Sequence, residues 1–386
     1  MQRDFHYYAT YCAAILAGYS HDESQKICYS AQLVDLCSRA LLAGLKAPPS
    51  AATTQLSMEM ADARTDLVGL QDITRIWASF HFLPYDLYAQ KKGCPKRYLN
   101  KYRLICKPNG MLLGKTVELA KGKSLQAIGL AMHVLADTWA HSNFAGTPSL
   151  VINNTDDYFY ELFPDGSERP VKFSHKPSGP DDLERGIYNS SLYQISENSI
   201  MNLGHGRAGH LPDYCFMRYK YLPAWAEYEE IVKDNPSDYL HAFCQMIEAL
   251  LYLRGEKESF APECYAWGVI EGWKAEIQEI LNRRQPDAEA DWKAFGKKLS
   301  GAELEDFDLM KYQMEYLDAE REKKNETFLG RFILAALAQK SMVTHQIFRS
   351  GNKCAGFSVD FLEKGFHGIR DYRRLVEQLR KEGENE

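Results

Sequence analysis

The sequence predicts a mainly α-helical fold, and three observations support this. Apolar residues recur three or four positions apart through most of the chain, as in Tyr8, Tyr11, Cys12 and Ile15, which is the spacing of one helix face. The chain has 386 residues, 45% of them hydrophobic and 25% charged, so it can bury a large core as an ordinary globular protein does. The stretch 146–182, rich in proline and asparagine, breaks the helical pattern.

The predicted helices begin and end at recognisable signals. Ser20 and Glu23 have the Ser-x-x-Glu spacing of a capping box, which opens a helix, and Pro48-Pro49 closes the region that follows. The apolar periodicity predicts helices over residues 5–18, 22–46, 62–80, 124–139, 214–232, 239–253 and 264–281, and a long helical segment after Glu303.

A small β-hairpin is predicted inside an insertion at about 147–182. Its strands are the aromatic run 158–163 and residues 171–173, with the turn signal Pro164-Asp165-Gly166 between them. We expect this hairpin to form a flap beside a site. The chain then divides into a metal-binding helical domain, residues 1–220, and a helical C-terminal region, residues 221–386, packed on the first.

Charge and composition exclude several classes of protein. The 52 acidic residues outnumber the 46 Lys and Arg, giving a net charge of −6, which argues against a broad nucleic-acid-binding surface. The nine cysteines contain no CxxC pair, so we expect reduced thiols and a cytoplasmic protein. The acid and imidazole in the start Met1-Gln2-Arg3-Asp4-Phe5-His6 favour an early helix over a secretory signal. No apolar run approaches the length of a transmembrane segment.

The most informative motif is a helical stripe of three side chains that can bind metal. His133, Asp137 and His141 are separated by four positions each, and four residues advance an α-helix by about 400°, which returns them to one face. Their neighbours are apolar, so a bare carboxylate there would be costly unless it were paired or coordinated. The alternative is a hydrogen-bonded polar group in the core.

A second concentration lies in the glycine-rich stretch 204–213. His205, Arg207, His210 and Asp213 stand there among three glycines that let the backbone turn closely around an ion or anion. The sequence leaves open whether His205, His210 or both are ligands, and a helix-capping Asp213 beside two exposed histidines is the alternative.

Three isolated polar residues complete the candidate set. Asp35 and His81 each stand in an apolar context, and a buried polar residue needs a partner. His6 lies near the start, on the same helix face as Thr10.

These motifs together resemble those of a bacterial domain-of-unknown-function family. Its members share an Asp-Phe-His-Tyr-type start, Phe-His-Phe-Leu-Pro, His-x-x-x-Asp-Thr-x-x-His and Gly-His…His-Leu-Pro-Asp, and the resemblance covers roughly residues 1 to 220. More distantly, the order of the His and Asp residues is similar to the zinc-dependent phospholipase C and single-strand nuclease superfamily. That resemblance implies an all-α fold with three zinc ions and the hydrolysis of phosphoesters.

The resemblance also implies a ligand set. Asp35, His81, His133 and Asp137 would hold one metal, and Asp137 would bridge to a second bound near His6. His141, one or both of His205 and His210, and Asp213 would hold the third. The superfamily uses a processed N-terminal Trp as a ligand, whereas this chain begins with Met1, and the last His and acid are spaced differently, so the sequence predicts two or three ions.

We therefore expect a metal-dependent hydrolase acting on a small phosphoester. Imidazole and carboxylate ligands favour zinc, with manganese or iron as alternatives. A metal-bridged water would attack phosphorus, with Asp35 as general base and Arg207 steadying a phosphate oxygen. The alternatives are hydrolysis of a non-phosphate bond and a non-catalytic scaffold in which one metal or a polar network ties the helices together.

Overall fold

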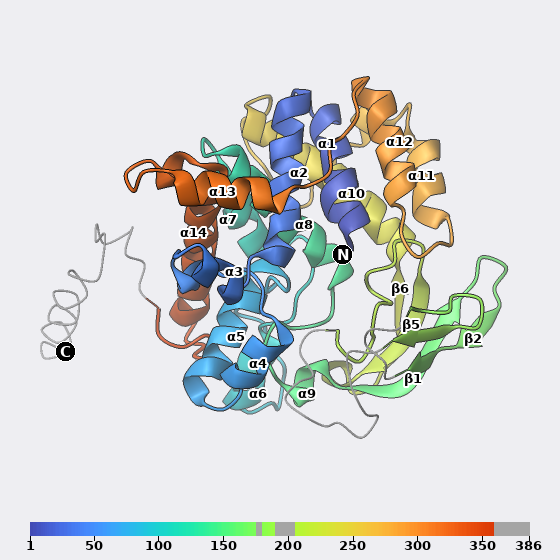
Figure 1. Ribbon diagram of the computed structural model, residues 1–386. Coiled ribbons are helices and arrows are strands. Elements are labelled where there is room, and N and C mark those ends of the chain that lie inside the picture. The colour runs from blue at the N-terminus through green and yellow to red at the C-terminus, as the bar shows by residue number, and fades with distance from the viewer. Residues whose placement is uncertain (175–179, 190–204, 359–386) are drawn as a thin grey trace, which may run out of the picture.

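A computed structural model describes residues 1–174, 180–189 and 205–358, and its architecture is mainly α-helical with a small sheet (Figure 1). The remaining residues, which include part of the predicted insertion and the end of the C-terminal region, lie outside the described residues. The elements of the N-terminal part are η1 (Asp4–Ala9), α1 (Thr10–Leu16), α2 (His21–Leu36), α3 (Arg39–Gly44), η2 (Pro49–Ala51), α4 (Ser57–Ala63), α5 (Leu67–Phe80), α6 (Lys96–Tyr102), α7 (Met111–Ala120), α8 (Leu125–Ala140) and α9 (Leu150–Asn153).

Local capping explains where these helices begin. The predicted capping box is confirmed, because the Ser20 hydroxyl accepts a hydrogen bond from the Glu23 backbone and the Glu23 carboxylate accepts one from the Ser20 backbone. The predicted helix 22–46 is broken after Leu36, and Ser38 caps the separate helix α3. Likewise, Asp66 caps α5, so the predicted segment 62–80 joins the end of α4 to a new helix.

The predicted hairpin is confirmed, but it belongs to a larger sheet. The strands are β1 (Thr155–Leu162), β2 (Glu168–Pro170), β3 (Lys172–Ser174), β4 (Ile187–Asn189), β5 (Arg218–Pro223) and β6 (Ile231–Asp234). One sheet has the order β2-β1-β5-β6 with antiparallel pairs, and β3 pairs with β4 in parallel. Tyr160 faces Pro170 and Phe159 faces Tyr221, so the second strand of the hairpin is 168–170 and not 171–173.

The predicted helix over 214–232 is wrong. Residues 218–223 form β5, in which Tyr219 and Tyr221 are buried while the residues beside them, Arg218, Lys220 and Leu222, are partly exposed. This burial repeats every second residue, the period of a strand, and tyrosine favours strands. The prediction followed the apolar residues of the longer segment 214–232 and missed this local two-residue period, and the pairing of β5 with β1 stabilises the strand.

The C-terminal elements are η3 (Ala224–Ala226), α10 (Asn235–Arg254), η4 (Trp267–Ile270), α11 (Lys274–Asn282), α12 (Glu289–Ser300), α13 (Leu309–Asp318), η5 (Lys324–Glu326) and α14 (Phe328–Arg349). The predicted helix 239–253 lies within α10. The predicted segment 264–281 becomes η4 and α11, and the segment after Glu303 becomes two helices separated at η5.

The core is built around α8, which packs against α2, α10, α14 and α7. One hydrophobic cluster contains residues from both halves of the chain, among them Leu130, Phe243 and Phe332. A smaller cluster, with Phe159 and Tyr221, lies on the sheet, which Figure 1 shows to one side of the helices. The two predicted regions therefore share a core, and α8 is its central helix.

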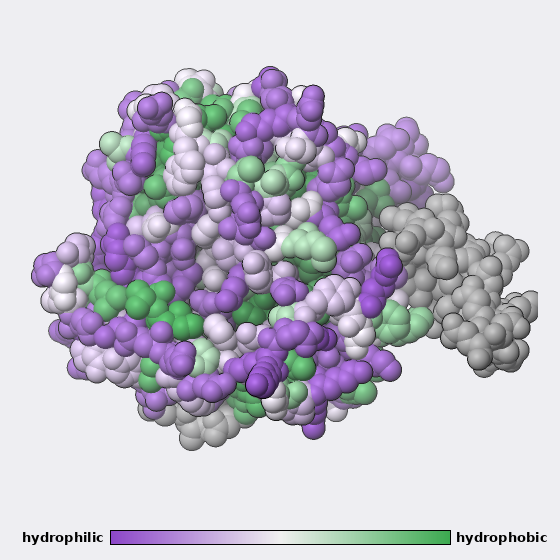
Figure 2. Space-filling view, turned by 180° about the vertical axis from the view of Figure 1, so that it is seen from behind, coloured by the Kyte–Doolittle hydropathy of each residue, from purple (hydrophilic) through white to green (hydrophobic). Residues whose placement is uncertain are grey.

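The outer surface is mostly polar on the face that Figure 2 shows, and hydrophobic residues there form small groups. Among the described helices, none is long and apolar enough to cross a membrane.

Candidate metal centre

The centre is built on the buried helix α8. His133 and Asp137 are fully buried in its last turns, and His141 is buried at its C-cap. The four-residue spacing brings Asp137 Oδ2 to 3.2 Å from His133 Nε2 and 3.5 Å from His141 Nδ1. Because Asp137 lies between the two imidazoles on the inner face of α8, it is the central residue of the cluster.

Two other segments bring imidazoles to Asp137. Element η1 places His6 Nε2 3.0 Å from Asp137 Oδ1, and the His6 ring stacks on the His133 ring with centroids 3.8 Å apart. His81 stands at the C-cap of α5, just before Pro84 ends any helical continuation, and its Nδ1 is 3.1 Å from Asp137 Oδ2. The last turn of α2 places Asp35 Oδ1 3.9 Å from both His81 Nδ1 and His133 Nε2.

The loop before β5 supplies the other end of the cluster. Asp213 Oδ1 is 3.3 Å from His141 Nε2, and Asp213 Oδ2 is 3.6 Å from His205 Nε2. The turn needs glycine at Gly209, where φ is +54° and a Cβ would lie 2.5 Å from the Asn189 carbonyl oxygen. This close turn lets the Gly209 carbonyl accept a hydrogen bond from His205 Nδ1 at 3.0 Å, which fixes the ring.

Three groups of side chains could therefore each hold a metal ion. They are His6, His133 and Asp137; Asp35, His81 and His133; and His141, His205 and Asp213. Within each group, the ligand atoms lie within 4.8 Å of one another. Every predicted ligand except His210 belongs to one of these groups.

His210 and Arg207 stand apart from the three groups in different ways. His210 Nδ1 is 3.0 Å from Asp181 Oδ2, and its side chain is 48% exposed. The Tyr214 hydroxyl also donates to Asp181, so His210 belongs to a small polar network beside the centre. Of the two histidines that the sequence left open, the structure brings His205 to the cluster. Arg207 is partly buried in the same loop, and its action on a substrate stays a prediction.

Backbone carbonyls orient three of the imidazoles. One nitrogen of each ring faces a carbonyl oxygen, and the second nitrogen then points into the cluster. His81 Nε2 faces the Thr53 carbonyl at 3.0 Å, and His141 Nδ1 faces the His81 carbonyl at 2.7 Å. A carbonyl oxygen only accepts, so these ring nitrogens carry the proton, as Nδ1 of His205 does. In the neutral imidazole, the opposite nitrogen then presents a lone pair to the carboxylates. This is the arrangement in which metal-bound histidines are usually held.

The remaining imidazole nitrogens also suit a cation. Nδ1 of His6 and Nδ1 of His133 are buried without a hydrogen-bond partner among the described residues. Unpaired buried nitrogens are costly, and lone pairs that face carboxylate oxygens repel them unless a positive charge lies between. The donor set therefore fits a metal better than it fits a closed hydrogen-bond network.

Burial sets the ionisation of the cluster. Loss of hydration lowers the pKa of His6, His133 and His205 to about 4, so these imidazoles are neutral near pH 7. Burial alone would raise the pKa of Asp137, but electrostatic interaction with His141 and with the Met1 amino group outweighs that effect and holds this pKa well below its usual range. Neutral imidazoles and an ionised carboxylate are the forms in which these side chains bind metals.

The amino group of Met1, which was not among the predicted ligands, also enters the cluster. It lies 2.8 Å from Asp137 Oδ1, 3.4 Å from Asp213 Oδ1 and 3.2 Å from His141 Nε2. Burial lowers its pKa, but the carboxylates of Asp137 and Asp213 outweigh that effect and raise the pKa to about 10. A positive charge is thus held between the first and third groups.

Residues 1–347 match the model of a family of unknown function, DUF6765. The chain belongs to this family. The match contains all three groups and continues through most of α14, well beyond the residues 1–220 that the sequence motifs covered. No curated protein and no solved structure matches the chain, and the resemblance to zinc-dependent phospholipase C stays a prediction.

The centre of this DUF6765 chain reaches solvent at two edges. The Asp35 side chain is 32% exposed at one edge, and those of His205 and Asp213 are 20% and 13% exposed at the other. The side chains of His6, His133 and Asp137 between them are fully buried. A small molecule can therefore approach the outer residues while the inner ones stay shielded from water.

Proposed function

We propose that the chain is a metal-dependent hydrolase whose substrate is a small phosphoester. The observation that carries the proposal is the orientation of His81, His141 and His205: one nitrogen of each ring faces a backbone carbonyl, and the other faces a carboxylate of one partly accessible cluster. A catalytic metal needs an open coordination position, and the exposed edges at Asp35 and Asp213 provide one for a substrate.

Zinc is the ion that this donor set favours, with manganese or iron as alternatives, and when bound it supplies Lewis acidity and a water of lowered pKa. The residues of the three groups would hold two or three ions. Asp137 presents one oxygen toward His6 and the other toward His133 and His81, which suits it to bridge two neighbouring positions.

Asp35 is the best candidate for the general base. Its Oδ1 is 3.9 Å from the nearest imidazoles, farther than Asp137, and it is the most exposed of the carboxylates in the three groups. A carboxylate in this position can take a proton from a water that enters at the same edge. Arg207 would contact a phosphate oxygen, since a guanidinium matches that geometry with two parallel hydrogen bonds.

Elemental analysis of tag-free protein purified without chelators tests the metal centre. We expect two or three equivalents of zinc, manganese or iron, largely lost in His133→Ala and Asp137→Ala. His210→Ala is the matched control, because it removes a neighbouring imidazole that lies outside the three groups, and it should keep its metal. A native chain that holds no metal after reconstitution would refute the proposal.

Kinetics with p-nitrophenyl phosphate and its diester then test the chemistry. Asp35→Asn should keep the metal and lose kcat if Asp35 is the base, whereas loss of metal would make it a ligand. Arg207→Ala should raise KM for phosphoesters, and unchanged kinetics would remove its assigned role. A chain that binds metal but hydrolyses neither ester would favour the scaffold alternative.

One group has the burial expected of a structural site. His6, His133 and Asp137 are fully buried, and an ion held there would tie η1 to α8. A closed site of this kind stabilises the fold without turnover. In that case, chelation would lower the melting temperature of the protein, and ions at the exposed groups would be removable without that effect.

A further inference from the structure

A histidine–carboxylate pair lies beside the metal centre, outside the three groups that could hold an ion. His210 Nδ1 is 3.0 Å from Oδ2 of Asp181, whose side chain is only 3% exposed. The imidazole itself is 48% exposed, and its Nε2 forms no hydrogen bond with a described residue. The ring is therefore fixed at one nitrogen, and its other nitrogen is free to exchange a proton with a bound molecule.

Asp181 is held by further hydrogen bonds that keep it ionised. Its Oδ1 accepts from the Asn189 backbone N–H at 2.6 Å and from the Asn189 side chain at 3.0 Å, and its Oδ2 accepts from the Tyr214 hydroxyl at 2.6 Å. Burial alone would raise the pKa of Asp181, but the hydrogen bonds from His210, Tyr214 and Asn189 outweigh burial and lower it. An ionised carboxylate at this distance stabilises a protonated imidazole.

One turn of backbone fixes both this pair and the ligands of the third group. The Asp213 N–H donates to the His210 carbonyl at 2.9 Å, and the neighbouring Gly209 carbonyl accepts from His205 Nδ1. The hydrogen bond to Asp181 raises the pKa of His210, and the charge of Asp213 adds to this effect, so the His210 and Asp213 side chains are close enough to interact. His210 therefore lies at the edge of the centre where His205 and Asp213 are exposed.

The two exposed edges of the centre suit the two ends of a displacement at phosphorus. Asp35, the proposed general base, is at one edge, and His210 is at the other. In phosphoryl transfer the attacking and leaving oxygens are roughly in line, so water enters on one side and the alcohol departs on the other. A base at the Asp35 edge and an acid at the Asp213 edge match these two positions.

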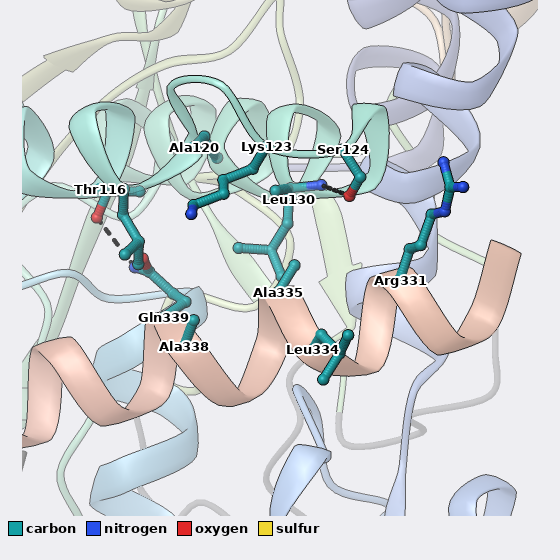
Figure 3. Close-up of a pocket in the computed structure, with 13 residues that line it drawn as sticks. Thr116, Ala120, Lys123, Ser124, Leu130, Arg331, Leu334, Ala335, Ala338 and Gln339 are labelled. Carbon is teal, nitrogen blue, oxygen red and sulfur yellow. Dashed lines mark hydrogen bonds between the residues drawn. The ribbon is translucent and has the colours of Figure 1, made fainter. Parts of the chain in front are cut away.

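A cavity elsewhere in the fold does not offer such an arrangement. It lies between α7, α8 and α14, has a volume of about 420 Å³, and none of its lining residues belongs to the three groups. Figure 3 shows its two cations, Lys123 and Arg331, at opposite ends, so they do not converge on one phosphate. We therefore expect a phosphoester at the edges of the metal centre.

We propose that His210 is the general acid that protonates the leaving alcohol, with Asp181 as its positioning residue. This inference rests on the hydrolysis proposed above and names its substrate class, phosphoesters of unactivated alcohols, whose alkoxides leave poorly without a proton. A water oxygen forms the new bond to phosphorus and gives a proton to Asp35. The ester P–O bond breaks, its electron pair stays on the alcohol oxygen, and that oxygen takes the proton of His210 Nε2. Solvent then returns a proton to His210 and removes the one on Asp35.

Two esters of similar shape test the proposal. The leaving group of p-nitrophenyl phosphate is a stable anion, whereas that of phenyl phosphate depends more on a proton. His210→Gln keeps a hydrogen-bond donor for Asp181 but cannot act as an acid. In the metal-loaded protein, it should lower kcat for phenyl phosphate by roughly tenfold or more and for p-nitrophenyl phosphate by less than about threefold. His21→Gln, at the start of α2, is the matched control and should leave both values unchanged.

The pH dependence tests the role of Asp181. With phenyl phosphate, kcat of the native chain should fall as the pH rises through the pKa of His210, and His210→Gln should lack this fall. Asp181→Asn keeps the imidazole but removes the charge that raises its pKa, so the fall should move to lower pH. A loss of packing alone would not move it, and an unmoved fall would contradict the positioning role. If Asp181→Asn fails to fold, the comparison of the two esters still decides the role of His210.

The remaining outcomes separate this inference from the proposed function. Equal losses with both esters, or no loss with either, would overturn the role of His210 and leave the hydrolase in place. Loss of metal from His210→Gln would make His210 a ligand, and hydrolysis of p-nitrophenyl phosphate alone by the native chain would show that no general acid acts there. Hydrolysis of neither ester by the metal-loaded native chain would overturn both the proposed function and this role.

Discussion

Gly129 sets how closely α2 and α8 approach, and replacing it with alanine should both destabilise the fold and disturb the metal centre. A Cβ at Gly129 would lie 2.1 Å from the Ile27 carbonyl oxygen and 2.7 Å from Ser30 Cβ. The carbonyl belongs to the backbone of α2, so it cannot rotate away as a flexible side chain would. The whole of α2, which carries Asp35, must therefore move away from α8.

The expected change in the free energy of unfolding of Gly129→Ala follows from two opposing effects. Alanine stabilises a helix interior by about 1 kcal/mol relative to glycine, while overpacking of a core costs about 1–3 kcal/mol. Because the obstacle is a backbone atom, the cost should be near the upper end, leaving a net loss of about 2 kcal/mol in the free energy of unfolding. Gly114 in α7 is the matched control, since its Cβ would lie 3.5 Å from Pro262 Cγ, an ordinary contact. Gly114→Ala should stabilise the protein by up to about 1 kcal/mol.

Urea unfolding followed by circular dichroism measures the stability of both variants, and zinc titration tests the effect on the proposed metal centre. Gly129→Ala should unfold at lower urea than the native chain, Gly114→Ala at equal or higher urea, and only Gly129→Ala should bind zinc more weakly. If the two alanine variants had equal stability, the close packing of α2 on α8 would not be what holds Asp35 beside His133.

The other predictions concern ionisation, a buried ion pair and the support of η1. Because the pKa values of His6 and His133 fall from 6.5 to about 4 on folding, the unfolded chain binds more protons between these values. The metal-free protein should therefore lose stability as the pH falls from 6.5 toward 4, and a constant urea midpoint across that range would contradict these pKa shifts. Glu161 is buried and forms ion pairs with Arg169 and Arg284. Glu161→Gln should lower the free energy of unfolding, measured by chemical denaturation, by about 2–3 kcal/mol. This loss is smaller than that for a fully buried ion pair because both arginines are partly exposed. Trp292 is fully buried against η1, so Trp292→Ala should lower the free energy of unfolding by about 3–5 kcal/mol. Because η1 carries His6, the variant should also bind zinc more weakly. Unchanged zinc affinity would show that this packing does not position His6.

Local patterns in the sequence predicted those parts of the site that lie on one helix. The spacing of His133, Asp137 and His141 placed all three on one face of α8, because an α-helix returns to the same face after about four residues. The capping box of Ser20 and Glu23 likewise predicted where α2 begins, since the two partners are only three positions apart along the chain.

Secondary structure that depends on contacts between distant segments could not be predicted from local patterns. In the stretch 218–223, Tyr219 and Tyr221 alternate with polar residues at the period of a strand, but the stretch is only six residues long, and its pairing with β1 and β6 made it a strand. The hairpin's second strand shifted for the same reason, because strand register is set by the neighbouring strand and the turn.

By itself, the sequence determined a mainly helical chain, a stripe of metal-capable residues on α8, and the set of residue types that surrounds it. Only the tertiary structure decided that His205 and not His210 faces Asp213, that backbone carbonyls orient three imidazoles, and that the Met1 amino group lies beside Asp137. The physical reason is that helical spacing is a property of neighbouring residues. The direction of a side chain in a loop depends on carbonyl groups and carboxylates that come from distant segments of the chain.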